Sequence, residues 1–201
     1  MSHSLLQREY GITATLPIYL KDPDVKKITQ VAFHRGPDRN FRNQLLVRLI
    51  LSTGLRRSEL ANLKVEDIDL EERVIYVRRG KGRKDRIVLV DEETLKLLRK
   101  FLGSRTTGSV FGVSPKRIYN IVKSMAAKAE VRNATKISPH KLRHTFAIQW
   151  IQRGGDIESL RRLLGHSRLN TTQVYLDFDF AYLRQAYDRL RSTKQQERRM
   201  V

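Results

Sequence analysis

The stretch from Phe41 to Ser52 constrains the fold of this chain more than any other feature. Its apolar side chains fall on nearly every side of a helix: Leu45, Leu46, Val47, Leu49, Ile50 and Leu51. A helix that is apolar all round has to be buried on all sides. We therefore expect this helix to lie in the core of a domain, with the other elements packed around it.

Further helices are predicted by apolar residues at helical spacing. They cover residues 22–31, 57–63, a stretch around 97–102, 114–129, 139–153 and 157–164. Two of them begin with a serine followed by proline, at Ser114 and Ser138, and Asp156 precedes the last one; serine and aspartate cap helices, and proline favours the first turn. Most of the chain is therefore expected to be helical.

One region departs from the helical pattern. Residues 74–77 and 87–90 are rich in β-branched residues and flank Gly80, Lys81 and Gly82. Two such runs about a glycine-containing turn predict a β-hairpin. The expected fold class is therefore mainly α, with a small antiparallel β-hairpin or sheet (α+β).

Charge indicates the class of partner. The chain has 201 residues, with 40 Lys and Arg against 21 Asp and Glu, a formal net charge of +19. Such an excess of positive charge is typical of proteins that bind polyanions, although a ribosomal or chromatin-like protein that only neutralises phosphates has it as well. Cysteine is absent, which excludes disulfides, thiolate nucleophiles and cysteine-ligated zinc.

The expected organisation is one principal domain. Residues 1–15 are predicted to be an N-terminal arm, 16–179 the main domain and 180–201 a basic amphipathic helix or tail. The last segment has an apolar stripe at helical spacing: Leu183, Ala186, Tyr187 and Leu190. The sequence contains no long apolar run and no signal peptide, so a cytoplasmic protein without a membrane segment is expected.

His140 and Arg143 lie three residues apart, in the first turns of the helix that begins at Ser138. Backbone N–H groups at a helix N-terminus favour an anion, and imidazole and guanidinium would strengthen a phosphate site there. His140 and His144 have the spacing of zinc ligands, but Lys141 stands where a zincin helix has glutamate and no third ligand is evident. No metal is therefore expected.

Two other segments contain polar residues suited to phosphate chemistry. Gly54 permits a sharp break after the central helix, so that Arg56 projects from a turn with Glu59 in reach of its guanidinium; a solvated surface pair is the alternative. His166 follows Gly165, and Tyr175 follows nine residues later. Either residue alone would be an ordinary helix-end or core residue.

Taken together, these segments resemble the catalytic domain of the tyrosine recombinases, or phage integrase family, and most of all its Xer-like branch. The resemblance covers about residues 16–190. The family's catalytic residues fall on Arg56, Lys81, His140, Arg143, His166 and Tyr175, with Glu59 as the acidic residue after the first arginine. Complete Xer-like enzymes have a helical core-binding domain before this region, which leaves a fragment and a naturally short member as alternatives.

The resemblance implies a reaction without a metal, ATP or any other cofactor. Tyr175 would attack a DNA phosphate and form a 3′-phosphotyrosine, with Arg56 and Arg143 binding the phosphate oxygens. His140 would take the tyrosine proton or bind the phosphate, His166 would be a further donor, and Lys81 would protonate the leaving 5′-oxygen. The implied partner is double-stranded DNA, bound by a homotetramer whose subunits are monomeric when free.

Other basic residues are candidates for DNA contact. In the helix from Ser114 the outward positions are Lys116, Arg117, Asn120 and Lys123, and the hairpin adds Arg79, Arg83 and Lys84. A basic helix face suits the major groove, although a merely solvated face has the same pattern.

Three functions remain in competition. The first is site-specific recombination, which pairs two DNA duplexes. The second is a type IB topoisomerase-like nicking and closing activity, which shares the chemistry. The third is a non-enzymatic DNA-binding regulator, which needs the basic surface and none of the catalytic residues.

Overall fold

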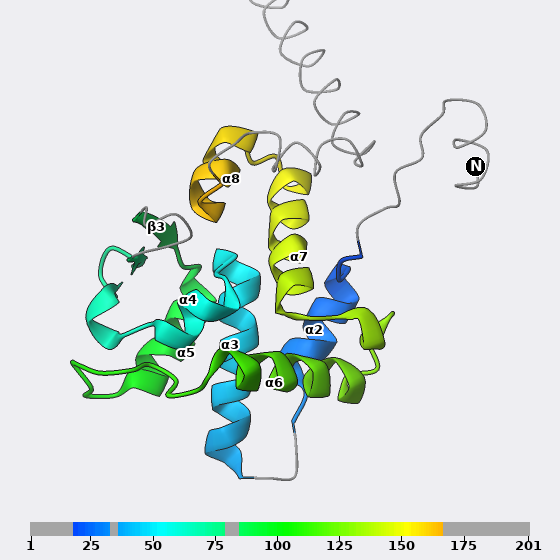
Figure 1. Ribbon diagram of the computed structural model, residues 1–201, viewed down its shortest axis with the longest axis horizontal. Helices are drawn as coiled ribbons and strands as arrows, with labels where there is room; N and C mark the ends of the chain where they lie inside the picture. Colours follow the sequence, from blue (N-terminus) through cyan, green and yellow to red (C-terminus); the bar gives the residue numbers. More distant parts are fainter. Residues whose placement is uncertain (1–17, 33–35, 79–84, 167–201) are drawn as a thin grey trace, which may run out of the picture.

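The computed structural model describes residues 18–32, 36–78 and 85–166. Its elements, in chain order, are α2 (Asp22–Gln30), α3 (Pro37–Thr53), α4 (Arg57–Asn62), the 3₁₀ turn η1 (Val65–Asp67), β1 (Ile68–Asp69), β2 (Val74–Val77), β3 (Arg86–Leu89), α5 (Glu92–Leu102), α6 (Pro115–Lys128), η2 (Ala134–Lys136), α7 (Pro139–Gln152) and α8 (Ile157–Leu164). The predicted fold class is confirmed: the described part of the chain is mainly helical with a small antiparallel sheet (Figure 1).

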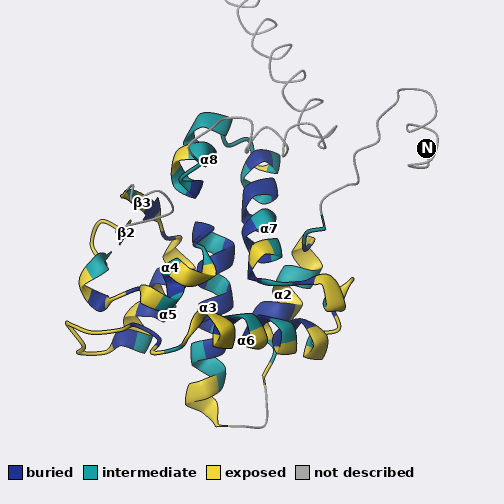
Figure 2. Ribbon diagram, viewed as in Figure 1, coloured by how far each residue is buried: buried dark blue, intermediate teal, exposed yellow. Residues whose placement is uncertain are grey.

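Helix α3 is the centre of the fold, as its apolar pattern predicted. Leu45, Leu46 and Leu49 are completely buried, and α3 packs against α2, α5 and α7. Figure 2 shows buried residues along most of α3 and exposed ones at its N-terminal end. The other helices therefore take their positions from this one.

The helix starts follow the predicted capping residues. Ser114 accepts a hydrogen bond from the backbone N–H of Arg117 (3.2 Å), and Ser138 accepts one from Lys141 (3.4 Å). Asp156 accepts from Ser159 N (2.8 Å) at the start of α8. Each bond satisfies a backbone donor that a helix leaves unpaired in its first turn.

The predicted hairpin is confirmed, and a third strand extends the sheet. β2 pairs antiparallel with β3, with Val77 opposite Arg86, and β1 pairs with the other edge of β2. Ile75 and Val88 are fully buried on one face, whereas Ile87 is 51% exposed on the other. This alternation places Arg86, two positions before Val88, on the inward face.

The buried side chains form two clusters. The larger joins α2–α6, the sheet and the first turns of α7. The smaller lies between α7 and α8: Phe146, Ala147, Ile148, Ile151, Leu160 and Leu164. Within the described residues, no helix is long and apolar enough to cross a membrane. The predicted arm 1–15 and tail 180–201 lie outside the described residues, so the domain boundaries stay a prediction.

Candidate active site

Arg56 lies at the sharp turn that ends α3. Gly54 adopts a left-handed conformation (φ 65°), and a Cβ atom there would stand only 2.6 Å from Cδ1 of Phe146. Arg56 caps α4: its Nη1 donates to Glu59 Oε1 (2.8 Å), and its backbone N–H donates to Glu59 Oε2 (2.8 Å). The carboxylate therefore fixes both the turn and the guanidinium, whereas the sequence had left a solvated surface pair as the alternative.

Arg143 is buried in α7, with 4% of its surface exposed. Its Nη1 donates to the carbonyl oxygen of Gly54 (2.5 Å), and its Nη2 donates to that of Leu164 (2.6 Å). A buried guanidinium needs such acceptors, because burial removes its bonds to water. The bonds also connect the end of α3 with the end of α8.

His166 follows α8 directly. Gly165 ends the helix in a left-handed conformation (φ 63°), and His166 Nε2 then lies 3.2 Å from Arg143 Nη2. Arg56 Nη2 donates to the carbonyl oxygen of Gly165 (3.4 Å). The two predicted phosphate-binding arginines, from opposite halves of the chain, thus meet at the turn that precedes His166.

His140 projects from the first turn of α7, and its ring packs edge-on against that of His144, with the centroids 4.2 Å apart. Partial burial, and then the charges of Lys141, Arg143 and Arg56, lower the pKa of His140. His140 therefore belongs to the electrostatic surroundings of both arginines. Among the described residues, no group of three His, Asp or Glu side chains is arranged to hold a metal ion.

The other two histidines near the site are neutral at physiological pH. Burial, followed by the positive charge of Arg143 and Arg56, lowers the pKa of His166 to about 4. The pKa of His144 also falls to about 4, because of burial and then the charge of His140. A guanidinium has only donors, so Nε2 of neutral His166 accepts from Arg143 and the ring proton lies on Nδ1.

Arg86 is a member of this cluster that the sequence analysis did not single out. Its Nη1 and Nη2 donate to the two carboxylate oxygens of Glu59 (2.8 and 2.7 Å), and its Nε donates to the carbonyl oxygen of Leu163 (2.8 Å). Burial alone would raise the pKa of Glu59, but the bonds and charge of Arg86, then those of Arg56, lower it to about 2. The period-2 alternation of β3 is the signal that would have marked Arg86 as inward-facing.

Comparison with known proteins shows which family this chain belongs to. The phage integrase family matches residues 19–181, most of the chain and all of the cluster just described. The chain belongs to the phage integrase family.

Relatives within the family are recombinases. Tyrosine recombinase XerA of Pyrococcus furiosus is 38% identical over 193 residues, which cover 90% of this chain and 65% of the relative. The chain thus spans slightly less than two thirds of that protein. A crystal structure of XerA recombinase matches with a TM-score of 0.73 and 34% identity, over 89% of this chain and 66% of the other.

A second solved structure similar to this phage integrase family chain contains DNA. It is XerH site-specific recombinase bound to its difH substrate in a pre-cleavage complex, with a TM-score of 0.68 and 27% identity, over 87% of this chain and 54% of that one. The fold described above is therefore similar to that of a recombinase bound to DNA.

The predicted DNA-contacting side chains of α6 do not all point outward. Lys116, Arg117 and Asn120 are exposed. Lys123 is half-buried instead: its ammonium donates to the carbonyl oxygen of Thr135 and lies 5.8 Å from the centre of the Tyr119 ring. The long lysine side chain folds back along the helix because a carbonyl and an aromatic face are within its reach.

Several predicted residues of this family member lie outside the described residues: Lys81, Arg79, Arg83, Lys84 and Tyr175. Their roles stay predictions. The segment 79–84 precedes β3 by a single residue, and Tyr175 follows His166 by nine positions in the sequence.

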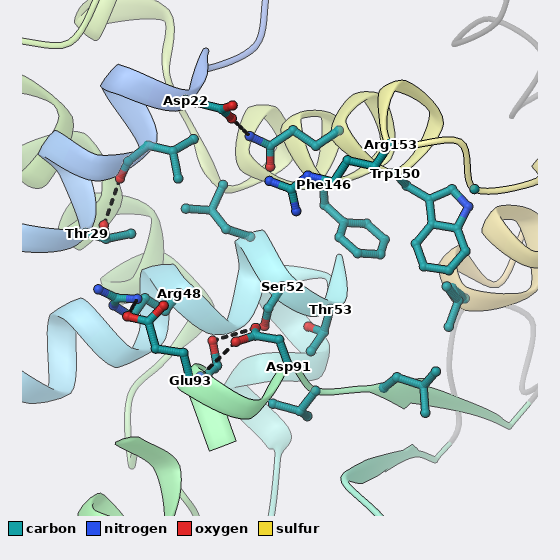
Figure 3. Close-up of a pocket in the computed structure, with 18 of the residues that line it drawn as sticks. Asp22, Thr29, Arg48, Ser52, Thr53, Asp91, Glu93, Phe146, Trp150 and Arg153 are labelled. Atoms are coloured by element: carbon teal, nitrogen blue, oxygen red, sulfur yellow. Dashed lines mark hydrogen bonds and ion pairs between the residues drawn. The ribbon is translucent and has the colours of Figure 1, made fainter. Parts of the chain in front are cut away.

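The structure also contains a groove of about 1210 Å³ (Figure 3). It is lined by residues of α2, α3, α7, α8, β3 and the start of α5, and none of Arg56, Arg143 and His166 contributes to it. Two of its charged groups form an ion pair: Arg48 Nη1 bonds to Glu93 Oε1 (2.8 Å). The groove therefore adjoins the candidate active site at Leu163 and does not include the predicted catalytic residues Arg56, Arg143 and His166.

Proposed function

We propose that this chain is the catalytic part of a site-specific DNA recombinase that cleaves and rejoins strands through a 3′-phosphotyrosine. The observation that carries the proposal is the convergence of Arg56 and Arg143 on the Leu164–Gly165 turn. Two guanidiniums fixed side by side, next to a histidine, suit the oxygens of a single phosphate. The names of the relatives, which are tyrosine recombinases, support the same activity.

The chemistry requires positive charge at the phosphate. A phosphodiester repels nucleophiles because it is negatively charged, and preorganised cations stabilise the additional charge of the transition state. Guanidinium groups suit phosphate oxygens, and both of these are held by backbone carbonyls before DNA arrives. Little reorganisation is then needed when the phosphate enters.

The proton transfers follow from the states of the side chains. Tyr175 Oη would form a bond to phosphorus while the bond from phosphorus to the 5′-oxygen breaks. His140 has a lowered pKa and is therefore neutral and able to accept the tyrosine proton. Lys81 would protonate the leaving 5′-oxygen, and His166 would give a further hydrogen bond to the phosphate.

Rejoining reverses these steps with the 5′-hydroxyl of another strand. The phosphotyrosine retains the energy of the broken bond, so ATP is not required. The proposed partner is double-stranded DNA, as in the XerH complex with difH, and the proposed assembly on DNA is a homotetramer of subunits that are monomeric when free. The proposed location is the cytoplasm.

Covalent capture of DNA tests the proposal. The full chain is incubated with duplex oligonucleotides of random sequence that carry a nick, so that a cleaved fragment diffuses away and the adduct cannot reverse. Denaturing gels should show adducts with the wild type and none with Tyr175→Phe, which removes one oxygen and no charge. Sequencing of the captured DNA then gives the target site.

The same experiment has a control for the identity of the nucleophile. Tyr182 is also in the C-terminal region, and Tyr182→Phe should still form adducts. Adducts that survive in Tyr175→Phe and disappear in Tyr182→Phe would reverse the assignment, and a wild type that captures no DNA would leave the regulator as the better hypothesis.

A second assay separates recombination from topoisomerase activity. A plasmid with two copies of the captured site should yield recombinant products. Relaxation of supercoils without any exchange between sites would favour the type IB topoisomerase-like alternative.

A further inference from the structure

Arg86 is a buried cation that the proposed chemistry does not use. Both it and Glu59 have side chains that are only 8% exposed, and it makes a two-pronged bond to Glu59 with a third bond to Leu163. Replacing a buried ion pair with apolar residues of similar volume is often neutral or stabilising, so packing alone is a weak reason for this arrangement. Its position suggests another reason.

Glu59 is shared between two arginines. Its Oε1 accepts from Arg86 Nη1 and from Arg56 Nη1, both at 2.8 Å. Because Arg86 binds both carboxylate oxygens, it fixes the plane of the carboxylate and thereby the direction in which Oε1 holds Arg56. The side chain of Arg56 is more exposed (23%) than that of Arg86 (8%), so less of the surrounding protein holds it in place.

Arg86 is in turn fixed to the end of α8. In addition to its bond to Leu163, it passes so close to Gly165 that a Cβ atom there would stand 2.9 Å from Arg86 Cδ. Arg56 and Arg143 bond to the same turn. The anchor of Arg86 is therefore the structural element on which the predicted phosphate-binding arginines converge.

We propose that Arg86 is a positioning residue, which acts through Glu59 to hold Arg56 in the direction that phosphate binding requires. The proposal rests on the function proposed above, since that function gives Arg56 its task. Lysine cannot replace Arg86, because a single ammonium cannot bind both carboxylate oxygens and the Leu163 carbonyl in one plane. Arg86 packs tightly against Gly165 and shares the Glu59 carboxylate with Arg56. The position of α8 therefore determines the position of Arg56.

Single-turnover cleavage of the captured site tests this coupling. Arg86→Met, which retains length and loses the fork, should slow cleavage about a hundredfold in the wild-type background, as expected for a misplaced catalytic group. In an Arg56→Ala background the same change should cost less than about threefold, because a residue that acts through another has no further effect when that residue is absent. Equal losses in both backgrounds would overturn the proposal.

Two further variants separate positioning from folding. Arg99 makes a similar pair of bonds away from the site, to the Leu70 carbonyl (2.7 Å) and to Glu71 Oε1 (2.9 Å), so Arg99→Met is the matched control and should cleave at the wild-type rate. Arg86→Lys keeps the charge and should remain folded by thermal unfolding, yet cleave as slowly as Arg86→Met. Full activity of Arg86→Lys would contradict the proposal.

A measurement without DNA keeps the two proposals distinguishable. In NMR spectra of isotope-labelled arginine side chains, the Nε–Hε signal of Arg56 should shift and broaden in Arg86→Lys and in Glu59→Gln, and remain unchanged in Arg99→Met. An unchanged Arg56 signal in Arg86→Lys would refute the positioning role. If the wild type captures no DNA while the Arg56 signal responds as expected, the proposed function fails and the hold of Arg86 on Arg56 stands.

Discussion

The carbonyl oxygen of Gly54 accepts a 2.5 Å hydrogen bond from Nη1 of Arg143, 89 residues further along the chain. The glycine turn that ends the central helix is therefore part of the candidate active site. Its left-handed conformation turns the carbonyl towards Arg143 and starts the segment that carries Arg56. The break in the helix and the position of both arginines have one structural origin.

Gly54→Ala should destabilise the protein more than alanine at another left-handed glycine. Gly112 has a similar φ of 60° with nothing within 4 Å of a Cβ, so Gly112→Ala should cost about 1 kcal/mol of unfolding free energy from backbone strain alone. At Gly54 the Cβ also meets Phe146 and Leu164, which adds about 1–3 kcal/mol of overpacking. Urea unfolding of both variants measures the difference, and equal losses would contradict the packing described here.

Lys81→Ala should slow strand cleavage severely, and a DNA substrate with sulfur in place of the bridging 5′-oxygen should restore it. A thiolate leaves without protonation, so the general acid is no longer needed. Arg56→Ala should show no such rescue, because phosphate binding is still required. Rates on the two substrates decide the matter; a Lys81→Ala enzyme that sulfur does not rescue would make the lysine a phosphate-binding cation.

Stability should fall as the solution is acidified below neutral pH. The pKa values of His144 and His166 drop from an ordinary 6.5 to about 4 in the folded chain. The unfolded chain therefore binds more protons between these values, and stability is full above pH 6.5 and lost as the pH falls towards 4. Thermal unfolding between about pH 7.5 and 5.5, where ordinary carboxylates stay ionised, isolates the histidines.

A variant assigns this pH dependence. His144→Gln removes one of the rings whose pKa is lowered, so its melting temperature should change less with pH than that of the wild type over the same range. An identical slope in the variant would show that His144 does not titrate as its burial requires.

Truncation after Asp179 should leave a folded protein that still cleaves the captured site and no longer assembles on paired sites. The expectation rests on the apolar stripe of residues 183–190, which has to pack against other apolar side chains to be removed from water. We predict that this segment docks on a neighbouring subunit when the chain assembles on DNA. Loss of cooperative thermal unfolding in the truncated chain would instead make the segment part of its own domain core.

Local signals in the sequence were sufficient for most of the fold. The apolar spacing of α3 and the caps at Ser114, Ser138 and Asp156 predicted helices that the structure contains. Strand β1, Ile68–Asp69, was not predicted, because two residues are too few to show an alternation. Its pairing with β2 depends on the tertiary fold.

Among the described residues, the sequence singled out Arg56, Glu59, Arg143 and His166, which lie together in the structure, and it said less about their connections. The spacing of Arg56 and Glu59 predicted their contact, which the structure contains. Arg86 appeared in the sequence as one more cation of a basic hairpin, since its burial follows from strand register and from the approach of α8. The inward turn of Lys123 likewise depends on Thr135, which a helical pattern cannot reveal.

The candidate site spans the boundary between the two hydrophobic clusters. Arg56 and Glu59 are at the start of α4, which packs with the larger cluster, whereas His166 and the Leu164 carbonyl depend on the smaller cluster between α7 and α8. Helix α8 has only eight residues, and a helix of that length does not persist without its packing. Detaching this one helix would remove one carbonyl acceptor from each of Arg56, Arg86 and Arg143 and leave the larger core folded. Inactivating the site therefore requires far less free energy than unfolding the domain, and hydrogen exchange should find the amides of α8 opening long before those of α3.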